Sequence, residues 1–235
     1  MLTVETPERQ TGVFFDRFWK KQEPERVDKR TLQRWKFVEA NLGFLPGKKI
    51  LDAGAGRGLT ARLLAEKGLE VSACDVSSDS VNLLRQQGLV GFVFDLEEDE
   101  LEQKYDAIFC LEVLQYLRYP ERAVLKLKDA LNPGGLLVVS LPNEFHILRR
   151  LGIFFGRTGW AGVTTPHLRL FDRKTAVWLF RQCRLKLVKM IPVTLCPPGL
   201  PGEGLARILA NWFCDWFSLS IIFYLRSDDG SSTAG

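Results

Sequence analysis

Short apolar runs alternate with helix-like segments between about residue 48 and residue 140 of the chain. The runs that we expect to be strands are 49–53, 69–74, 91–94, 105–110 and 136–141. Between them lie segments with helical spacing of apolar residues, at 59–67, from 78 onward and at 120–131. This alternation predicts right-handed crossover connections and a parallel sheet with helices on both faces.

Two less regular regions flank this pattern. Residues 1–44 are expected to form an aromatic-rich helical lead-in or cap, and residues 45–226 to form one α/β domain. Within that domain we expect 142–172 to be an irregular basic and aromatic segment that contacts substrate. A helix at 173–181 and strands at 185–193 and 219–225 complete the domain, and 227–235 is expected to be a disordered tail.

Composition excludes several classes of protein. With 235 residues, 46% hydrophobic and 26% charged, the chain has the composition of a globular protein, and a net charge of +4 does not by itself predict nucleic-acid binding. Its five scattered cysteines and two distant histidines indicate neither a disulfide framework nor a metal site. No secretory signal and no apolar run of about 20 residues is recognisable, so we expect a cytoplasmic protein without a transmembrane segment.

The sequence D-A-G-A-G-R-G at 52–58 stands where a predicted strand turns into a predicted helix. Glycines there let the backbone approach a ligand closely, and the alternative is a plain tight turn. Asp75 and Asp95 end the next two strands, where folds of this type bind ligands. A dinucleotide fingerprint would need glycine at position 59, which is leucine. Asp52 would repel a pyrophosphate, so we expect a cofactor with a cationic amino-acid part.

These motifs, with C-D-V-S at 74–77 and L-N-P-G-G-L-L-V-V-S-L-P-N at 131–143, resemble the class I S-adenosylmethionine-dependent methyltransferases. The resemblance implies a Rossmann-like seven-stranded, mostly parallel sheet with helices on both faces and a reversed last hairpin. It implies S-adenosyl-L-methionine as the cofactor. The cofactor-binding residues that it implies are Asp52, Gly54, Ala55, Gly56, Gly58, Asp75, Val76, Asp95, Leu96 and Leu111.

Two later motifs, N-E-F-H at 143–146 and H-L-R-L-F at 167–171, are similar to methionine-biosynthesis protein W and the ubiquinone-biosynthesis O-methyltransferases. The chain departs from that subgroup at Gln115 and Tyr116, where Glu and His are usual, which argues against metal-assisted chemistry at that point. Methyl transfer depends mainly on positioning, and a base is needed only if the acceptor loses a proton. The candidates are His167 first, then His146, with Tyr116 as a substrate contact; a structural role stays open for each.

Residues 144–174 carry six basic side chains against two acidic ones. This leaves two equal interpretations, a lid that recruits an anionic substrate and a solvated loop face. Phe154, Phe155 and Trp160 in the same segment leave an apolar cap or a peripheral membrane contact open. The apolar face of 205–217 is expected to pack in the core, with lipid or partner contact as the alternative.

The leading hypothesis is therefore a methyltransferase that acts on a small molecule, anionic or lipid-like, at oxygen rather than nitrogen or carbon. The alternatives are a protein- or RNA-directed methyltransferase and a cofactor-binding module without activity. No DNA partner is expected, because C-L-E-V at 110–113 lacks the Asn/Asp-Pro-Pro-aromatic pattern of adenine amino-methyltransferases. The sequence leaves the oligomeric state open.

Overall fold

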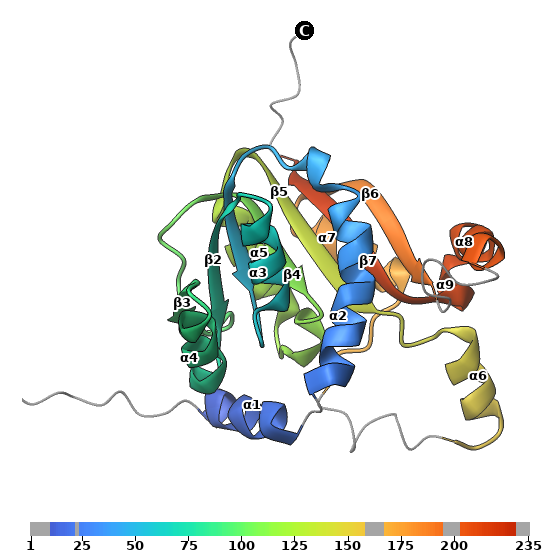
Figure 1. Cartoon of the computed structure of the whole chain (residues 1–235). Helices are drawn as coiled ribbons and strands as arrows, with labels where there is room; N and C mark the ends of the chain where they lie inside the picture. Colours follow the sequence, from blue (N-terminus) through green and yellow to red (C-terminus); the bar gives the residue numbers. More distant parts are fainter. Residues whose placement is uncertain (1–9, 22–23, 158–166, 195–202, 229–235) are drawn as a thin grey trace, which may run out of the picture.

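A computed structural model describes residues 10–21, 24–157, 167–194 and 203–228 of the chain. Its centre is a seven-stranded sheet in the order β3-β2-β1-β4-β5-β7-β6 (Figure 1). The strands are β1 (Lys49–Ala53), β2 (Glu70–Asp75), β3 (Val90–Val93), β4 (Tyr105–Leu111), β5 (Leu131–Pro142), β6 (Leu185–Thr194) and β7 (Ser218–Ser227). The first five run parallel, whereas β7 pairs antiparallel with both β5 and β6. The predicted Rossmann-like sheet with a reversed last hairpin is confirmed.

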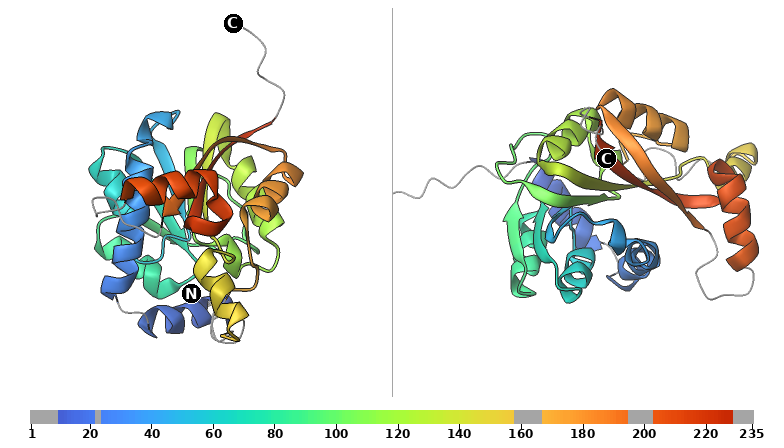
Figure 2. Two further views of the ribbon diagram at one scale, coloured as in Figure 1. Left: turned by 90° about the vertical axis from the view of Figure 1, so that its right-hand side faces the viewer. Right: turned by 90° about the horizontal axis from the view of Figure 1, so that it is seen from above.

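Helices cover both faces of this sheet (Figure 2). The helices are α1 (Gln10–Lys21), α2 (Pro24–Glu39), α3 (Leu59–Glu66), α4 (Ser78–Gln86), α5 (Pro120–Asp129), α6 (Ile147–Phe154), α7 (Arg173–Gln182), α8 (Glu203–Trp212) and α9 (Cys214–Phe217), with short 3-10 turns η1 (Leu42–Phe44) and η2 (Leu114–Tyr116). Buried residues of α5 and α7 pack on one face, and those of α2, α3 and α4 on the other. Along β4, Ile108 and Cys110 face the first core and Ala107 and Phe109 the second. A central strand that is buried on both sides reads as a continuous apolar run, which is why it was recognisable in the sequence.

Two expectations about the second half of the chain need correction. The segment 142–172, expected to be irregular, contains α6, and Trp160 lies outside the described residues. The apolar stretch 205–217 was expected to pack in the core, and this is wrong. It forms α8 and α9, where only Ala210 and Cys214 are buried among the side chains that the structure describes. The physical reason is position: these helices lie at the end of the β6–β7 hairpin, away from the helices that cover the two faces of the sheet (Figures 1 and 2).

Candidate active site

The glycine-rich turn connects β1 to α3 and is held against the end of β2. The backbone N–H groups of Gly54 and Ala55 both donate to the carbonyl oxygen of Cys74, at 2.8 and 2.9 Å. Gly54 has a φ of 76°, and a Cβ atom there would lie 2.4 Å from Cγ2 of Val113. Glycine is therefore required both by the left-handed backbone and by the close approach of the segment after β4.

Asp52 lies near the carboxyl end of β1 and is 2% exposed. Burial, and then the neighbouring charge of Asp75, raise its pKa to about 7, although a hydrogen bond from the backbone N–H of Ala61 opposes the shift. Its Oδ2 atom has no hydrogen-bond partner among the described residues. A buried carboxylate oxygen without a partner is costly, so this position is complementary to a cationic group.

Asp75, at the end of β2, is also buried, but the backbone already engages both of its oxygens. Oδ2 accepts a hydrogen bond from Gly56 N–H at 2.8 Å, and Oδ1 accepts one from Ser77 N–H at 2.9 Å. Burial raises the pKa of Asp75 above its ordinary value, and these two hydrogen bonds oppose the shift. Asp75 therefore braces the glycine turn against the segment after β2.

Helix α1 lies across the ends of β2 and α4, against the segment that follows Asp75 (Figure 1). Asp16 accepts a hydrogen bond from Ser77 Oγ at 2.5 Å. A Cβ atom on Gly12 would lie 2.8 Å from the carbonyl oxygen of Val76, so the helix contacts that backbone directly. The lead-in thus forms one wall of the site, which its aromatic pattern alone did not indicate.

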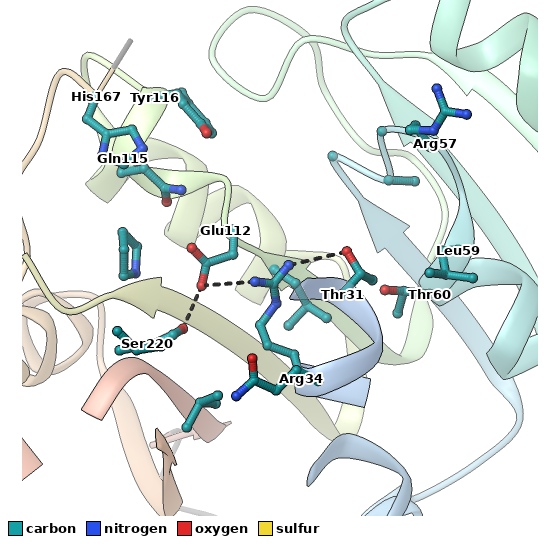
Figure 3. A pocket seen from close by; sticks show the side chains of 18 of the residues that line it. Thr31, Arg34, Arg57, Leu59, Thr60, Glu112, Gln115, Tyr116, His167 and Ser220 are labelled. Carbon is teal, nitrogen blue, oxygen red and sulfur yellow. Dashed lines mark hydrogen bonds and ion pairs between the residues drawn. The ribbon is translucent and has the colours of Figure 1, made fainter. Parts of the chain in front are cut away.

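A cavity of about 420 Å³ opens beside the glycine turn (Figure 3). On the side of the turn it is lined by Asp52, Gly54, Ala55, Gly56, Arg57 and Thr60. On the opposite side it is lined by Leu111, Glu112, Gln115, Tyr116, His146, Arg149 and His167. The fold therefore brings five of the expected cofactor-binding residues together with all three expected catalytic candidates.

The other expected cofactor-binding residues lie outside the described wall of this cavity, namely Gly58, Asp75, Val76, Asp95 and Leu96. Gly58 is the N-cap of α3 with a φ of 78°. Asp95 accepts a hydrogen bond from Glu97 N–H at 2.9 Å, and Leu96 is buried in the core beneath α5. That these five residues bind the cofactor stays a prediction.

Glu112 occupies the centre of the cavity wall (Figure 3). It follows β4 directly and has a φ of 59°, an uncommon conformation for a residue with a side chain. Its Oε1 accepts hydrogen bonds from Ser140 Oγ at 3.1 Å and Ser220 Oγ at 2.6 Å, and lies 3.9 Å from a guanidinium nitrogen of Arg34. Strained backbone of this kind clusters at functional sites.

His167 is paired with the carboxylate of Glu144, which is 4% exposed. Nδ1 of His167 lies 2.8 Å from Oε1 of Glu144, and Oε2 of Glu144 forms an ion pair with Arg149. Burial lowers the pKa of His167, the charge of Glu112 raises it, and that of Arg149 lowers it; the net shift is downward. The ring is therefore neutral at pH 7, and Nε2 is the nitrogen that Glu144 leaves available.

His146 and Tyr116 reach the same cavity with different surroundings. His146 precedes α6, burial lowers its pKa, and its Nδ1 has no hydrogen-bond partner in the part of the chain that the structure describes. Tyr116 stacks edge-on against His167, with ring centroids 5.1 Å apart, and against Phe15 of α1. Tyr116 therefore links the His167 ring to helix α1 through aromatic contacts.

Three of the residues in this network did not emerge as site residues from the sequence: Arg34, Glu112 and Glu144. Glu112 belongs to the recognised C-L-E-V motif, but its left-handed backbone is not readable from residue types. Arg34 comes from α2, about 80 residues earlier in the chain, and no local pattern links it to β4. Glu144 was counted only as one acid of a basic segment, whereas burial and its contact with His167 give it a specific place.

The chemistry of this site fits S-adenosylmethionine. The unpartnered Oδ2 of Asp52 matches a cationic methionine portion. Gly54 and Gly56 both have positive φ. A Cβ atom on Gly56 would lie 3.0 Å from the ring of Trp19, so a side chain at this position would crowd the surface of the turn. A pyrophosphate-containing cofactor would meet the Asp52 carboxylate instead of the N–H groups it requires.

Comparison with known proteins places the chain in a family. A family model described as a methyltransferase domain matches residues 18–189, which is more than half of the chain. Together with the sheet order and the glycine turn, this match shows that the chain belongs to the class I S-adenosylmethionine-dependent methyltransferases.

Curated relatives share the name ubiquinone biosynthesis O-methyltransferase. That of Alkalilimnicola ehrlichii is 35% identical over 119 residues, which cover 47% of this chain and 48% of that protein. That of Idiomarina loihiensis is 30% identical over 116 residues, which cover 46% and 48%. The chain thus matches these relatives over about half of their length.

Solved structures share the fold. An S-adenosylmethionine-dependent methyltransferase from Mesorhizobium loti is 20% identical with a TM-score of 0.61, over 83% of this chain and 97% of that one. Magnesium protoporphyrin IX methyltransferase from Synechocystis, solved with bound S-adenosylhomocysteine, is 18% identical with a TM-score of 0.56, over 86% and 82%. At these identities the likeness bears on the fold alone.

Proposed function

We propose that this chain transfers a methyl group from S-adenosylmethionine to a hydroxyl oxygen of a small molecule. The observation that carries the proposal is that His167, which contacts the buried Glu144, and the Asp52 glycine turn line one cavity of about 420 Å³. Such a volume lies within the range of small-molecule sites, about 300–1,000 Å³. The name O-methyltransferase of the partial relatives supports the choice of acceptor atom.

When bound, S-adenosylmethionine supplies an electrophilic methyl group beside a positive sulfur. In the chain, Asp52 provides the negative charge that holds the cationic methionine portion, and the glycine turn admits it at the end of β1. Leu111 contributes apolar surface to the cavity on the side opposite to the glycine turn.

His167 acts as the base in this proposal. Its Nδ1–H donates to Glu144, which fixes the tautomer and leaves Nε2 to accept the proton of the acceptor hydroxyl. The lowered pKa keeps the ring neutral at physiological pH, and the Glu144 carboxylate stabilises the positive charge that develops when the proton arrives. Tyr116 packs on the ring and keeps it in the cavity wall.

The acceptor that this wall suits is anionic and partly apolar. Arg57 lies on the cavity wall, and planar guanidinium groups recognise carboxylates and phosphates. Arg34 and Arg149 also line it, paired with Glu112 and Glu144. Phe18 and Trp19 of α1 contribute apolar surface to the same wall. A hydroxylated aromatic acid or an amphiphile with an anionic group has this combination.

Turnover measurements test the proposal. Purified protein is incubated with S-adenosylmethionine and a panel of phenols, catechols and hydroxy acids, and S-adenosylhomocysteine formation is followed. We expect turnover with a member of the panel, and a loss of at least about 100-fold in kcat for His167→Gln with unchanged cofactor affinity. Methylation of RNA or protein fractions without any small-molecule turnover would contradict it, as would cofactor binding without any turnover.

A further inference from the structure

One end of the molecule presents large apolar side chains to solvent. They come from α6, its C-cap Phe155, α8 and α9, and we call them the apolar face: Leu148, Leu151, Ile153, Phe154, Phe155, Leu205, Ile208, Trp212, Phe213 and Trp216. Phe154 is 81% exposed and Trp212 is 80% exposed. Exposed apolar side chains scattered singly are normal, but a contiguous group of this kind marks an interaction surface.

The two parts of the apolar face are physically joined. The guanidinium carbon of Arg150 in α6 lies 4.6 Å from the ring centroid of Trp216 in α9. Just before α6, the side-chain amide of Asn143 donates to the carbonyl oxygens of Ser218, at 2.9 Å, and Asp215, at 3.2 Å. Figures 1 and 2 both show α6 beside α8 and α9 at the same end of the molecule.

The charge beside this face is positive. Residues 145–157 hold Arg149, Arg150 and Arg157 and no acidic residue. Arg149 is paired with Glu144, whereas the guanidinium group of Arg150 lies against Trp216 of the apolar face. On α9, Asp215 is neutralised by an ion pair with Arg173 at 3.0 Å.

Tryptophan and phenylalanine beside arginine suit one partner in particular, the headgroup and acyl boundary of an anionic bilayer. Aromatic rings prefer that boundary, and basic side chains are attracted to anionic headgroups. A second copy of the chain would bring two positively charged α6 segments together, which is unfavourable. Helices α6, α8 and α9 have 8, 10 and 4 residues, and none of the described helices is long and apolar enough to cross a membrane, so they would lie in the interface plane.

We propose that the apolar face docks this chain peripherally onto an anionic lipid bilayer. The cavity adjoins this face, because Asn143, His146 and Arg149 line the cavity and lead into or belong to α6. Docking would therefore hold the entrance of the cavity near the lipid headgroups, where an amphiphilic acceptor is concentrated. Docking itself does not depend on the proposed acceptor or on His167 acting as a base.

Vesicle flotation with the purified full chain tests this docking. One set of vesicles contains phosphatidylglycerol and phosphatidylcholine in equal parts, and the other contains phosphatidylcholine alone. We expect the chain to float with the anionic set, to bind the neutral set more weakly, and to lose affinity in about 0.5 M NaCl, which screens surface charges. Trp212→Asp and Phe154→Asp, on different helices, should each weaken binding about tenfold or more, because each removes a large exposed apolar group and adds a repelled charge.

Trp178→Asp is the matched control, because Trp178 is an exposed tryptophan of α7 outside the apolar face and its substitution changes the net charge equally. It should leave vesicle binding unchanged, and S-adenosylhomocysteine binding should be equal in all variants. Absence of flotation with anionic vesicles overturns the proposal, as does equal weakening by Trp178→Asp. A dimer that Trp212→Asp dissociates, without vesicle binding, would assign the face to a second copy and overturn it too. Turnover in vesicle-free solution tests the acceptor proposal separately.

Discussion

Nδ1 of His167, in the wall of the candidate active site, lies 2.8 Å from Oε1 of Glu144, a carboxylate that is almost completely buried. A buried carboxylate that contacts one ring nitrogen fixes which nitrogen carries the proton. The pair spans 23 residues of sequence and joins the end of β5 to the segment before α7. This contact favours His167 over His146 as the base.

Replacement of Glu144 by glutamine tests this pair. Glu144→Gln keeps a hydrogen-bond acceptor for Nδ1–H but loses the charge that stabilises the imidazolium, so kcat should fall by about 10- to 100-fold. The KM for S-adenosylmethionine should change little, since Glu144 contacts His167, on the side of the cavity opposite to the glycine turn. Steady-state kinetics with a working acceptor measure both constants. Thermal unfolding serves as the control, and an unchanged kcat in a folded variant would contradict the role.

The acidity dependence of the reaction should follow His167. Burial sets its pKa below the ordinary 6.5, so the ring loses its basic form only as the pH falls below that value. We expect kcat/KM to be level above pH 7 and to decline in more acidic solution. Because the charge of Glu112 raises the pKa of His167, Glu112→Gln should move the decline to lower pH. A decline that Glu112→Gln moves to higher pH would exclude His167 as the titrating base.

Ionised Asp52 should lower the free energy of unfolding of the protein without cofactor. Its pKa is raised from 3.8 to about 7, so between these pH values the folded state retains a proton that the unfolded state releases. The free energy of unfolding therefore falls as the pH rises toward 7. Asp52→Asn should therefore raise the free energy of unfolding at pH 8 by about 2 kcal/mol while weakening cofactor binding. Urea unfolding at pH 5 and pH 8 measures the first effect.

Asp106→Asn is the control with the opposite sign. Hydrogen bonds from Lys49 N–H and the Asn132 amide hold the pKa of Asp106 below its ordinary value, so its loss should lower stability at pH 8. The loss should shrink as the pH falls through the lowered pKa of Asp106. Destabilisation of the unliganded protein by Asp52→Asn at pH 8 would contradict the costly burial of an ionised Asp52.

Asp75 should support cofactor binding through the glycine turn. Asp75→Ala leaves the N–H groups of Gly56 and Ser77 without their acceptors, and each such buried group costs about 1–3 kcal/mol. S-adenosylhomocysteine affinity should fall about tenfold or more, whereas His167→Ala should leave it unchanged. Titration calorimetry compares the two variants. Equal losses of S-adenosylhomocysteine affinity in both would contradict a specific role of Asp75 in cofactor binding.

The parts of this structure that follow from local pattern were predictable. Apolar runs and helical spacing predicted the succession of strands along the chain, and the glycine turn after β1 pointed to residues that line the cavity, because both depend on residues close together in sequence. Contacts between distant segments were not predictable. The ion pair of Arg34 with Glu112, and the packing of Gly12 in α1 on Val76, exist only once the sheet has brought their elements together.

The stretch 205–217 shows a second limit. Its spacing correctly indicated an apolar helical face, and α8 has that face. Periodicity does not say what covers an apolar face, and Trp212 lies in solvent rather than in the core. Burial depends on the position of the helix relative to the sheet, which in this chain is set by the end of the β6–β7 hairpin.

Titration calorimetry of the purified chain with S-adenosylhomocysteine tests the cofactor site most directly. We predict one site per chain with a micromolar Kd, tighter at pH 8 than at pH 6 because Asp52 is ionised at the higher pH, and markedly weakened by Asp52→Asn. Absence of heat at high micromolar S-adenosylhomocysteine, or binding that Asp52→Asn leaves unchanged, would contradict the assignment of the Asp52–Gly58 turn as the cofactor site.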